Sequence, residues 1–334
     1  MPVLSFVALI LPSIQNPLGA LPSRFRREQV LIVGCGDVGL RVAAQLAGRV
    51  QLRALTSTPD RIDKLRRARI VPLRGNLDDA ATLQRLAGIA TRVLHLAPPA
   101  NAQAGEWWRD FRTQALLRAL AKRSPARCVV YASTSGVYGD CGGARVTEAR
   151  PANPATPRAQ RRHDAERLMR NFGRRTPPVR TSILRVPGIY GPGRSGGARE
   201  RLLQNAPVLR AQDDVFTNHI HADDLARALV AAMWRGRAQR TYNANDDTQL
   251  KAGDYYDLAA DIFGLPRPRR VPRDSAEREL SLNSLSFLHD SRRMSNTRLK
   301  RELRVVLRYP TVREGLIELA ALVKESPSAR AKVR

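Results

Sequence analysis

The amino-acid sequence predicts an α/β protein in which a doubly wound parallel sheet carries a smaller α/β lobe at its C-terminal end. First, an apolar, β-branched run at residues 30–33 ends in a glycine-rich turn, as buried parallel strands often do. Second, short apolar runs alternate with amphipathic stretches up to residue 185, which indicates helices on both faces of a parallel sheet. Third, 43% hydrophobic and 26% charged residues are typical of a globular protein.

The glycine-rich turn has the pattern G-x-G-x-x-G, formed by Gly34, Gly36 and Gly39. In such a turn the first glycine permits a sharp bend, the second lets the backbone approach a pyrophosphate, and the third brings helix and strand together. Asp37 and Val38 begin the following helix, whose free N–H groups and dipole favour phosphate groups. The turn and its flanking elements therefore predict a Rossmann-type dinucleotide site.

The remaining elements follow in order along the chain. Apolar runs predict strands at 51–55, 70–73, 92–96, 127–131 and 179–185, and a further strand at 241–245. Amphipathic patterns predict helices at 62–68, 83–86, 106–122 and 158–172. In the third of these helices, Trp108 is expected to share a buried face with Phe111, so that its tryptophans serve packing or helix pairing.

This pattern divides the chain into four parts. Residues 30–190 form the expected nucleotide-binding domain, and residues 191–325 form the C-terminal lobe, with the strand near 241–245 returning to the sheet. Residues 326–334 are a polar tail, and residues 1–29 are an N-terminal extension that we expect to be disordered or to reflect a misplaced start codon. A signal peptide fits less well, because the first basic residue is Arg24 and prolines interrupt the apolar run.

The net charge of +27 raises the question of nucleic-acid binding, and its makeup argues against it. Only six of the 57 Lys and Arg residues are lysines, a skew typical of genome-wide codon bias, and the arginines are scattered rather than clustered. The three cysteines lack metal-binding spacing and fit a reducing, cytoplasmic compartment. We also expect no metal site and no membrane association.

Several motifs in order make the chain similar to a known family. They lie at residues 34–39, 75–79, 95–99, 133–139, 185–193, 219–225 and 242–243. The chain resembles an extended short-chain dehydrogenase/reductase of the NAD(P)-dependent epimerase/dehydratase type, over residues 30–322. This resemblance implies that Asn76 and Leu77 contact the adenine, and that Ala97, Pro98, Pro187 and Ile189 also contact the cofactor.

One departure from the family pattern, in the catalytic pair, bears on whether this protein is an enzyme. Family enzymes carry Tyr-x-x-x-Lys on the helix after strand five, where the tyrosine transfers a proton and the lysine holds the nicotinamide ribose. Here Arg158 and Arg162 occupy the two positions, and no tyrosine lies between Tyr138 and Tyr190. Arginine stays protonated at any usable pH and cannot act as the acid. Thr134 matches the catalytic Ser/Thr of the family, so Thr134 and Arg162 are the candidate catalytic residues.

Four other groups could supply a proton instead. They are Tyr138, Tyr190, His163 and His95. Each also has a structural interpretation: the tyrosines are structural positions of the family, His163 is expected to face solvent, and His95 is expected to be buried and hydrogen-bonded. His219 and His221 belong to a structural motif of the family and are not expected to bind metal.

The end of the second strand indicates which cofactor is used. NAD-preferring sites place an acidic residue there to bind the ribose 2′-hydroxyl, but this chain has Thr56 and Ser57 with Arg61 nearby. Hydroxyl and guanidinium groups would bind a 2′-phosphate. We therefore expect NADP rather than NAD, unless Arg61 is one more solvated arginine.

The sequence thus predicts an NAD(P)-binding, oxidoreductase-like protein that acts on a small molecule of unknown identity. The alternative is a redox sensor or protein-interaction module without turnover, resembling NmrA-like proteins, with a regulatory protein as its partner. The resemblance also implies a homodimer through helices 106–122 and 158–172, although the arginines of the second helix would repel across the dimer axis unless partnered.

Overall fold

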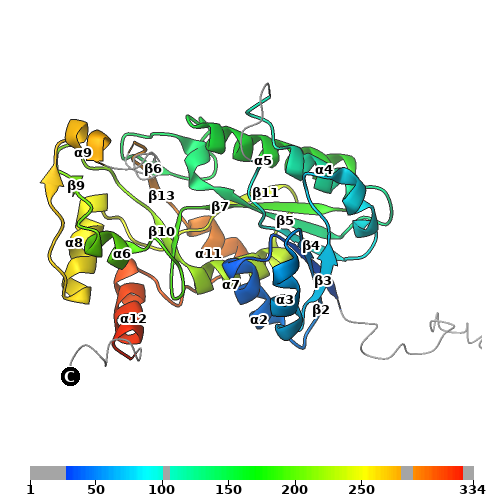
Figure 1. Cartoon of the computed structure of the whole chain (residues 1–334). Helices are drawn as coiled ribbons and strands as arrows, with labels where there is room; N and C mark the ends of the chain where they lie inside the picture. The colour runs from blue at the N-terminus through cyan, green and yellow to red at the C-terminus, as the bar shows by residue number, and fades with distance from the viewer. Residues whose placement is uncertain (1–27, 101–105, 280–288, 326–334) are drawn as a thin grey trace, which may run out of the picture.

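The computed structural model describes residues 28–100, 106–279 and 289–325. Its centre is a seven-stranded parallel sheet in the order β11-β7-β5-β4-β1-β2-β3 (Figure 1). The strands are β1 (Gln29–Val33), β2 (Gln51–Thr56), β3 (Val71–Arg74), β4 (Arg92–His95), β5 (Cys128–Thr134), β7 (Arg180–Val186) and β11 (Arg240–Asn243). Every neighbouring pair is parallel, which confirms the predicted Rossmann-type fold.

Helices cover both faces of this sheet (Figure 1). One face packs against α4 (Phe111–Leu120) and α5 (Pro157–Arg175), and the other against α2 (Asp37–Leu46), α3 (Ile62–Arg67), α7 (Ala222–Arg235) and α11 (Thr297–Leu303). In β1, Val30 and Ile32 face one core while Leu31 and Val33 face the other. Successive side chains of a strand point to opposite faces, so a continuously apolar strand suits a sheet covered on both sides.

Two predicted helices differ in detail from those observed. Residues 80–86 form a 3₁₀-helix, η2 (Ala80–Leu86), in place of an α-helical turn, and η1 (Pro59–Arg61) precedes α3. The helix expected at 106–122 begins at Phe111, because the Asp110 carboxylate accepts a hydrogen bond from the Thr113 N–H and caps the helix there. The expectation that Trp108 is buried was wrong: it precedes the helix and is 44% exposed.

The C-terminal part of the chain builds a second, smaller core beside the carboxyl ends of the strands (Figure 1). Its elements are α6 (Ala198–Leu203), β9 (Val208–Leu209), α8 (Ala252–Phe263), β12 (Arg270–Val271), α9 (Arg273–Glu279) and α12 (Val312–Glu325). Three short strand pairs lie outside the main sheet: β8 (Gly188–Tyr190) with β10 (His219–His221), β9 with β12 inside the smaller lobe, and β6 (Arg145–Val146) with β13 (Arg293–Met294). β11 returns to the edge of the main sheet beside β7.

The expected N-terminal extension and polar tail lie outside the described residues, apart from Glu28 and Gln29. Within the described residues, no helix combines the length and the apolar character needed to cross a bilayer.

Candidate dinucleotide site

The glycine turn between β1 and α2 has the geometry that the sequence predicts. Gly34 has φ +87°, and a Cβ there would lie 2.5 Å from the backbone nitrogen of Ala97, so only glycine permits this close approach to the end of β4. A Cβ on Gly39 would lie 3.2 Å from the Cys35 sulfur and 3.3 Å from Ile32, where helix and strand pack together. A Cβ on Gly36 would meet nothing within 4 Å. The backbone of Gly36 therefore borders open space at the N-terminus of α2.

This open space fits a pyrophosphate. A side chain at position 36 would occupy the space that a bound phosphate needs, while the first N–H groups of α2 have no carbonyl partners within the helix. Asp37 does not point freely into this space: its carboxylate pairs with Arg41 Nε at 2.9 Å and with Arg194 Nη1 at 2.6 Å. The residues present therefore fit a dinucleotide.

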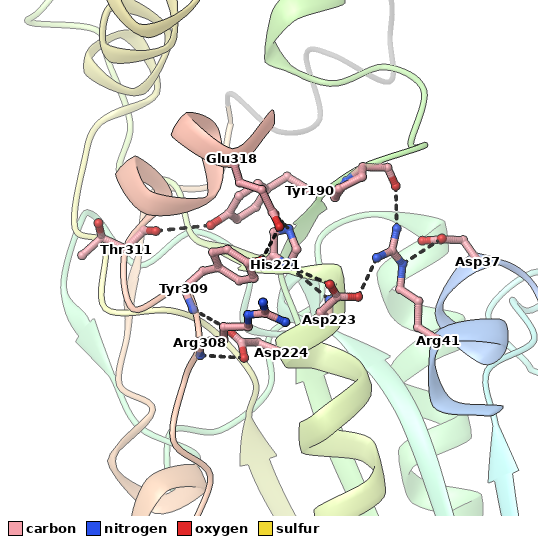
Figure 2. Close-up of polar contacts among 11 residues, drawn as sticks. Asp37, Arg41, Tyr190, His221, Asp223, Asp224, Arg308, Tyr309, Thr311 and Glu318 are labelled. Atoms are coloured by element: carbon pink, nitrogen blue, oxygen red, sulfur yellow. Dashed lines mark hydrogen bonds and ion pairs between the residues drawn. The ribbon is translucent and has the colours of Figure 1, made fainter. Parts of the chain in front are cut away.

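A network of polar contacts, some of them ion pairs, ties the glycine turn to the C-terminal lobe (Figure 2). Arg41 reaches from α2 to Asp223 at 2.6 Å and to the carbonyl oxygen of Pro192 at 2.5 Å. Further along, His221 Nε2 lies 3.4 Å from Glu318 of α12, and Asp224 accepts hydrogen bonds from the N–H groups of Arg308 and Tyr309. The helix that begins the dinucleotide site is thereby fixed against the lobe that covers it.

The residues predicted to select the cofactor lie together beside the glycine turn. The guanidinium of Arg61 donates a hydrogen bond to the carbonyl of Cys35 at 3.2 Å and is otherwise exposed. Ser57 is exposed, whereas Thr56 is 8% exposed and its hydroxyl already bonds the backbone of Thr58. Within this group, Ser57 and Arg61 are the side chains free to meet a 2′-phosphate.

The predicted adenine contacts follow β3, and two further predicted cofactor contacts follow β4. Asn76 is exposed and its side-chain oxygen accepts a hydrogen bond from the Asp78 N–H, while Leu77 is buried in the core. Ala97 is buried against Gly34, and Pro98 is exposed, with its carbonyl accepting from Arg112 at 3.2 Å. All four residues follow strands at the carboxyl edge of the sheet, where doubly wound folds bind their ligands.

A cavity of about 510 Å³ extends from this edge into the C-terminal lobe. Its wall includes five predicted residues from separate parts of the chain, namely Val38, Thr134, Arg162, Pro187 and Ile189. Thr134 ends β5, and its hydroxyl oxygen accepts a hydrogen bond from the Gly136 N–H at 3.3 Å. The hydroxyl proton of Thr134 has no acceptor among the described residues and can be donated to a ligand in the cavity.

Arg162 reaches the cavity from α5 at the position where the family carries lysine. It is 8% exposed and donates to the Ala132 carbonyl at 2.7 Å and to the Tyr131 hydroxyl at 3.2 Å. Its charge is part of the reason that His95 is neutral, since burial and then Arg162 lower the pKa of His95 to about 3. His95 bonds Thr113 at 2.9 Å and is buried as expected.

The other proposed proton donors differ in their burial and in whether they line the cavity. Tyr138 is buried and donates to Asn243 at 2.7 Å, away from the cavity. The expectation that His163 faces solvent was wrong. His163 is half-buried because α5 packs along the sheet, and this burial lowers its pKa. Tyr190 lines the cavity, and its hydroxyl donates to the Thr311 carbonyl at 3.4 Å. Burial raises the pKa of Tyr190, which keeps the phenol protonated.

Sequence reasoning missed the residues that the C-terminal lobe contributes to the cavity. Tyr255 and Tyr256 of α8 line it, with Arg201 of α6 lying over the Tyr256 ring at 5.1 Å. The ring of His219 stacks on Tyr255 at 4.1 Å, and burial lowers the pKa of His219 to about 4. The only available signal was two adjacent tyrosines in an amphipathic stretch, which does not identify a ligand site. In the described residues no group of histidine, cysteine and acidic side chains is arranged to hold a metal.

Comparison with known proteins agrees with this geometry. The model of the NAD dependent epimerase/dehydratase family matches residues 30–244, whereas no curated protein matches the chain. A functionally unknown conserved protein from Silicibacter pomeroyi shares 28% identity, with 90% of this chain and 100% of that chain covered and a TM-score of 0.71.

Two enzymes of known activity share the fold at lower identity. The UDP-glucose 4-epimerase from Thermotoga maritima, solved with UDP-glucose, is 19% identical with a TM-score of 0.71, covering 89% of this chain and 99% of that one. The dTDP-glucose 4,6-dehydratase DesIV from Streptomyces venezuelae, solved with NAD, is 21% identical with a TM-score of 0.72, covering 90% and 98%. With the glycine turn, the carboxyl-edge cavity and the family match together, the chain belongs to the NAD-dependent epimerase/dehydratase family.

Proposed function

We propose that the protein is an NADP(H)-binding oxidoreductase whose small-molecule substrate occupies the cavity between the sheet and the C-terminal lobe. The observation that carries this proposal is the convergence of Val38, Thr134, Arg162 and Ile189 on one cavity beside the open backbone of Gly36. The adenine half of the dinucleotide would lie along the exposed strand ends, and the nicotinamide end would enter the cavity. NADP(H), when bound there, supplies or accepts a hydride.

NADP(H) is favoured over NAD(H) by charge. Arg61 and Ser57 offer donors beside the glycine turn, and no acidic residue ends β2. A guanidinium gains charge-assisted hydrogen bonds from a phosphate, whereas a ribose hydroxyl offers it much less. The selectivity of this site therefore rests mainly on Arg61.

The proposed catalytic groups are Thr134 and Arg162. The free hydroxyl proton of Thr134 would hydrogen-bond a substrate oxygen, and Arg162 would hold polar groups at the nicotinamide end. Of the alternative proton donors, Tyr190 alone has both a protonated hydroxyl and a place in the cavity wall. A proton delivered in this cavity would then come from water ordered by Thr134, or from Tyr190 once its hydroxyl releases the Thr311 carbonyl.

A second function is favoured by one observation: α5 presents arginines where the family carries its acid and lysine. Nearby positive charge would repel NADP⁺, which carries one more positive charge at its ring than NADPH. A protein that distinguishes the two redox forms could act as a sensor without turnover, because a ligand shifts an equilibrium through differential affinity. Tenfold discrimination needs about 1.4 kcal/mol.

Calorimetric titration with NADPH, NADP⁺, NADH and NAD⁺ tests the proposal. We expect NADPH to bind at least tenfold more tightly than NADH, and Arg61→Ala to remove most of this difference. Arg67→Ala is the matched control, because Arg67 is an exposed arginine at the end of α3, the helix that Arg61 precedes, and it makes no ion pair with the other described residues. Equal affinities for NADPH and NADH in the unmodified protein would refute the cofactor preference.

A screen of carbonyl compounds that monitors NADPH consumption then separates the two functions. Turnover supports the oxidoreductase. Strong discrimination between NADPH and NADP⁺ with no turnover would instead favour the sensor.

A further inference from the structure

The wall of the cavity is rich in arginine and poor in acid. Among the described residues that line it, the arginines are Arg158, Arg162, Arg194, Arg201 and Arg292, and the single carboxylate is Asp290. Two of these arginines are neutralised, since Arg194 pairs with Asp37 at 2.6 Å and Arg292 with Asp290 at 3.0 Å. Arg201 lies over an aromatic ring in the far lobe. Like Arg201, Arg158 and Arg162 have no carboxylate partner among the described residues, and these two lie one helical turn apart on α5.

Arg162 is the more buried of this pair. Its two hydrogen bonds go to neutral oxygens of β5, and its buried Nε has no partner among the described residues. The acidic residues around it are engaged elsewhere. Glu166 binds Arg185 at 2.8 Å and Arg170 at 3.0 Å, and Asp110 accepts from the Thr113 N–H and hydroxyl. Arg162 is therefore a buried cation that makes no ion pair with a described carboxylate, although the charge of Asp110 lies near enough to interact with it.

Arg158 lies in the first turn of α5 and lines the cavity. It is exposed, and it makes no hydrogen bond or ion pair with the described residues. Partial burial, and then the charges of Arg162 and Arg161, lower its pKa. The first turn of α5 contains no acidic residue, so the positive end of the helix dipole adds to the charge of both arginines.

A buried charge without a partner is costly in free energy, and an anion that binds beside it recovers part of that cost. Residues four positions apart share one face of a helix, so Arg158 and Arg162 present their charges to the same region. The planar guanidinium fork suits the two oxygens of a carboxylate or phosphate better than an uncharged group.

We propose that Arg158 and Arg162 form an oxyanion-binding site, and that the substrate is an acid that carries a carboxylate or phosphate beside its reacting carbon. The role of this site in substrate binding rests on the proposed function, whereas anion binding itself does not. Anchoring the acidic group on α5 places the adjacent carbon near Thr134, whose hydroxyl proton is free to bond its oxygen. The two arginines, which occupy the positions of the family's tyrosine and lysine, would thus position the substrate.

The experiment measures anion binding to the cofactor-free protein. Malonate and inorganic phosphate serve as probes, and malonamide serves as the uncharged analogue of malonate. Titrations are made by calorimetry at a fixed ionic strength of about 0.15 M, where exposed charges are largely screened beyond about 8 Å. We expect one of the two anions to bind saturably, malonamide not to bind, and Arg158→Gln to weaken the bound anion at least tenfold. The anion that binds more tightly identifies the substrate as a carboxylate or a phosphate.

The matched control is Arg174→Gln, which removes the same charge from the exposed far end of α5. Anion affinity should change less than twofold in this variant. Because Arg158 is exposed and unpaired, Arg158→Gln should fold normally; Arg162→Lys, which keeps the charge but not the fork, provides a second test and should weaken binding severalfold. Equal weakening by Arg174→Gln and Arg158→Gln, or no saturable binding of either anion, would overturn the proposal.

Titration of the same variants with NADPH distinguishes a failure of the anion site from a failure of the proposed function. If malonate or phosphate binds through Arg158 and NADPH does not bind, the anion site stands and the cofactor proposal fails. If NADPH binds but neither anion does, and Arg158→Gln weakens NADPH, the arginines serve the cofactor. The anion proposal then fails while the oxidoreductase proposal survives.

Discussion

Two neighbouring glycines should respond in opposite ways to substitution. Gly34→Ala should destabilise the fold, because the new Cβ would lie 2.5 Å from the Ala97 nitrogen at a φ of +87°. Gly36→Val should leave the fold intact, because position 36 has φ −82° and a Cβ there meets nothing within 4 Å. It should nevertheless abolish dinucleotide binding, because the valine would fill the space beside the N-terminus of α2.

The sizes of the two effects follow from this geometry. A left-handed conformation costs an ordinary residue about 1–2 kcal/mol, and overpacking against backbone that cannot rotate away adds about 1–3 kcal/mol. For a chain of this length each kcal/mol lowers the melting temperature by about 1.5 °C, so Gly34→Ala should lower it by about 3–7 °C. At Gly36, the N-cap of α2, exchange for valine, which is a poor N-cap residue, should cost about 1 kcal/mol.

Thermal unfolding by circular dichroism measures the first effect, and calorimetric titration with NADPH measures the second. For Gly36→Val we expect at least a hundredfold loss of affinity, equivalent to about 2.7 kcal/mol, with an almost unchanged melting temperature. A folded Gly36→Val protein with unchanged NADPH affinity would refute the reasoning, since the turn would then be purely structural. A Gly34→Ala protein as stable as the unmodified chain would refute the packing argument.

Three further predictions concern selectivity, pH and buried charge. Ser57→Asp should weaken NADPH at least tenfold and spare NADH, because a carboxylate at this exposed position would face the 2′-phosphate; titration of both cofactors checks this, and equal losses would contradict it. The pKa of His219, lowered to about 4 by burial, means that only the unfolded chain gains a proton as the pH falls from about 6.5 to 4. This histidine should therefore cost about 3 kcal/mol of stability over that range, and His219→Phe should flatten the urea-unfolding profile there; an unchanged slope would argue against a neutral histidine. Glu166→Gln should destabilise the protein by about 3–5 kcal/mol, because it leaves the buried Arg185 unpaired; a change below 1 kcal/mol in urea unfolding would show that the pair is not needed.

The sheet could be predicted from sequence because its strands are buried on both faces. Apolar runs such as residues 30–33 need no tertiary information, and the glycines mark where the chain must bend. The end of a helix was harder to predict. α4 begins at Phe111 because the buried carboxylate of Asp110 caps it, and the amphipathic pattern that continues back through Trp108 gave no sign of this.

The candidate site, like the fold, could be predicted from sequence only in part. Residues near the glycine turn could be assigned because each follows a predicted strand, and parallel strands place their carboxyl ends along one edge. The wall supplied by the C-terminal lobe could not be assigned, since Arg201 and Tyr255 come together only through packing of α6 on α8. The unpaired state of Arg162 was also invisible in sequence, because it depends on Glu166 being engaged by Arg185 and Arg170.

The most direct test of the central claim is a crystal structure of the complex with NADPH. Our account predicts the pyrophosphate against Gly36, the 2′-phosphate within hydrogen-bond distance of Arg61, and the nicotinamide in the cavity beside Thr134. A complex with the dinucleotide bound elsewhere, or with its nicotinamide end outside the cavity, would contradict the account.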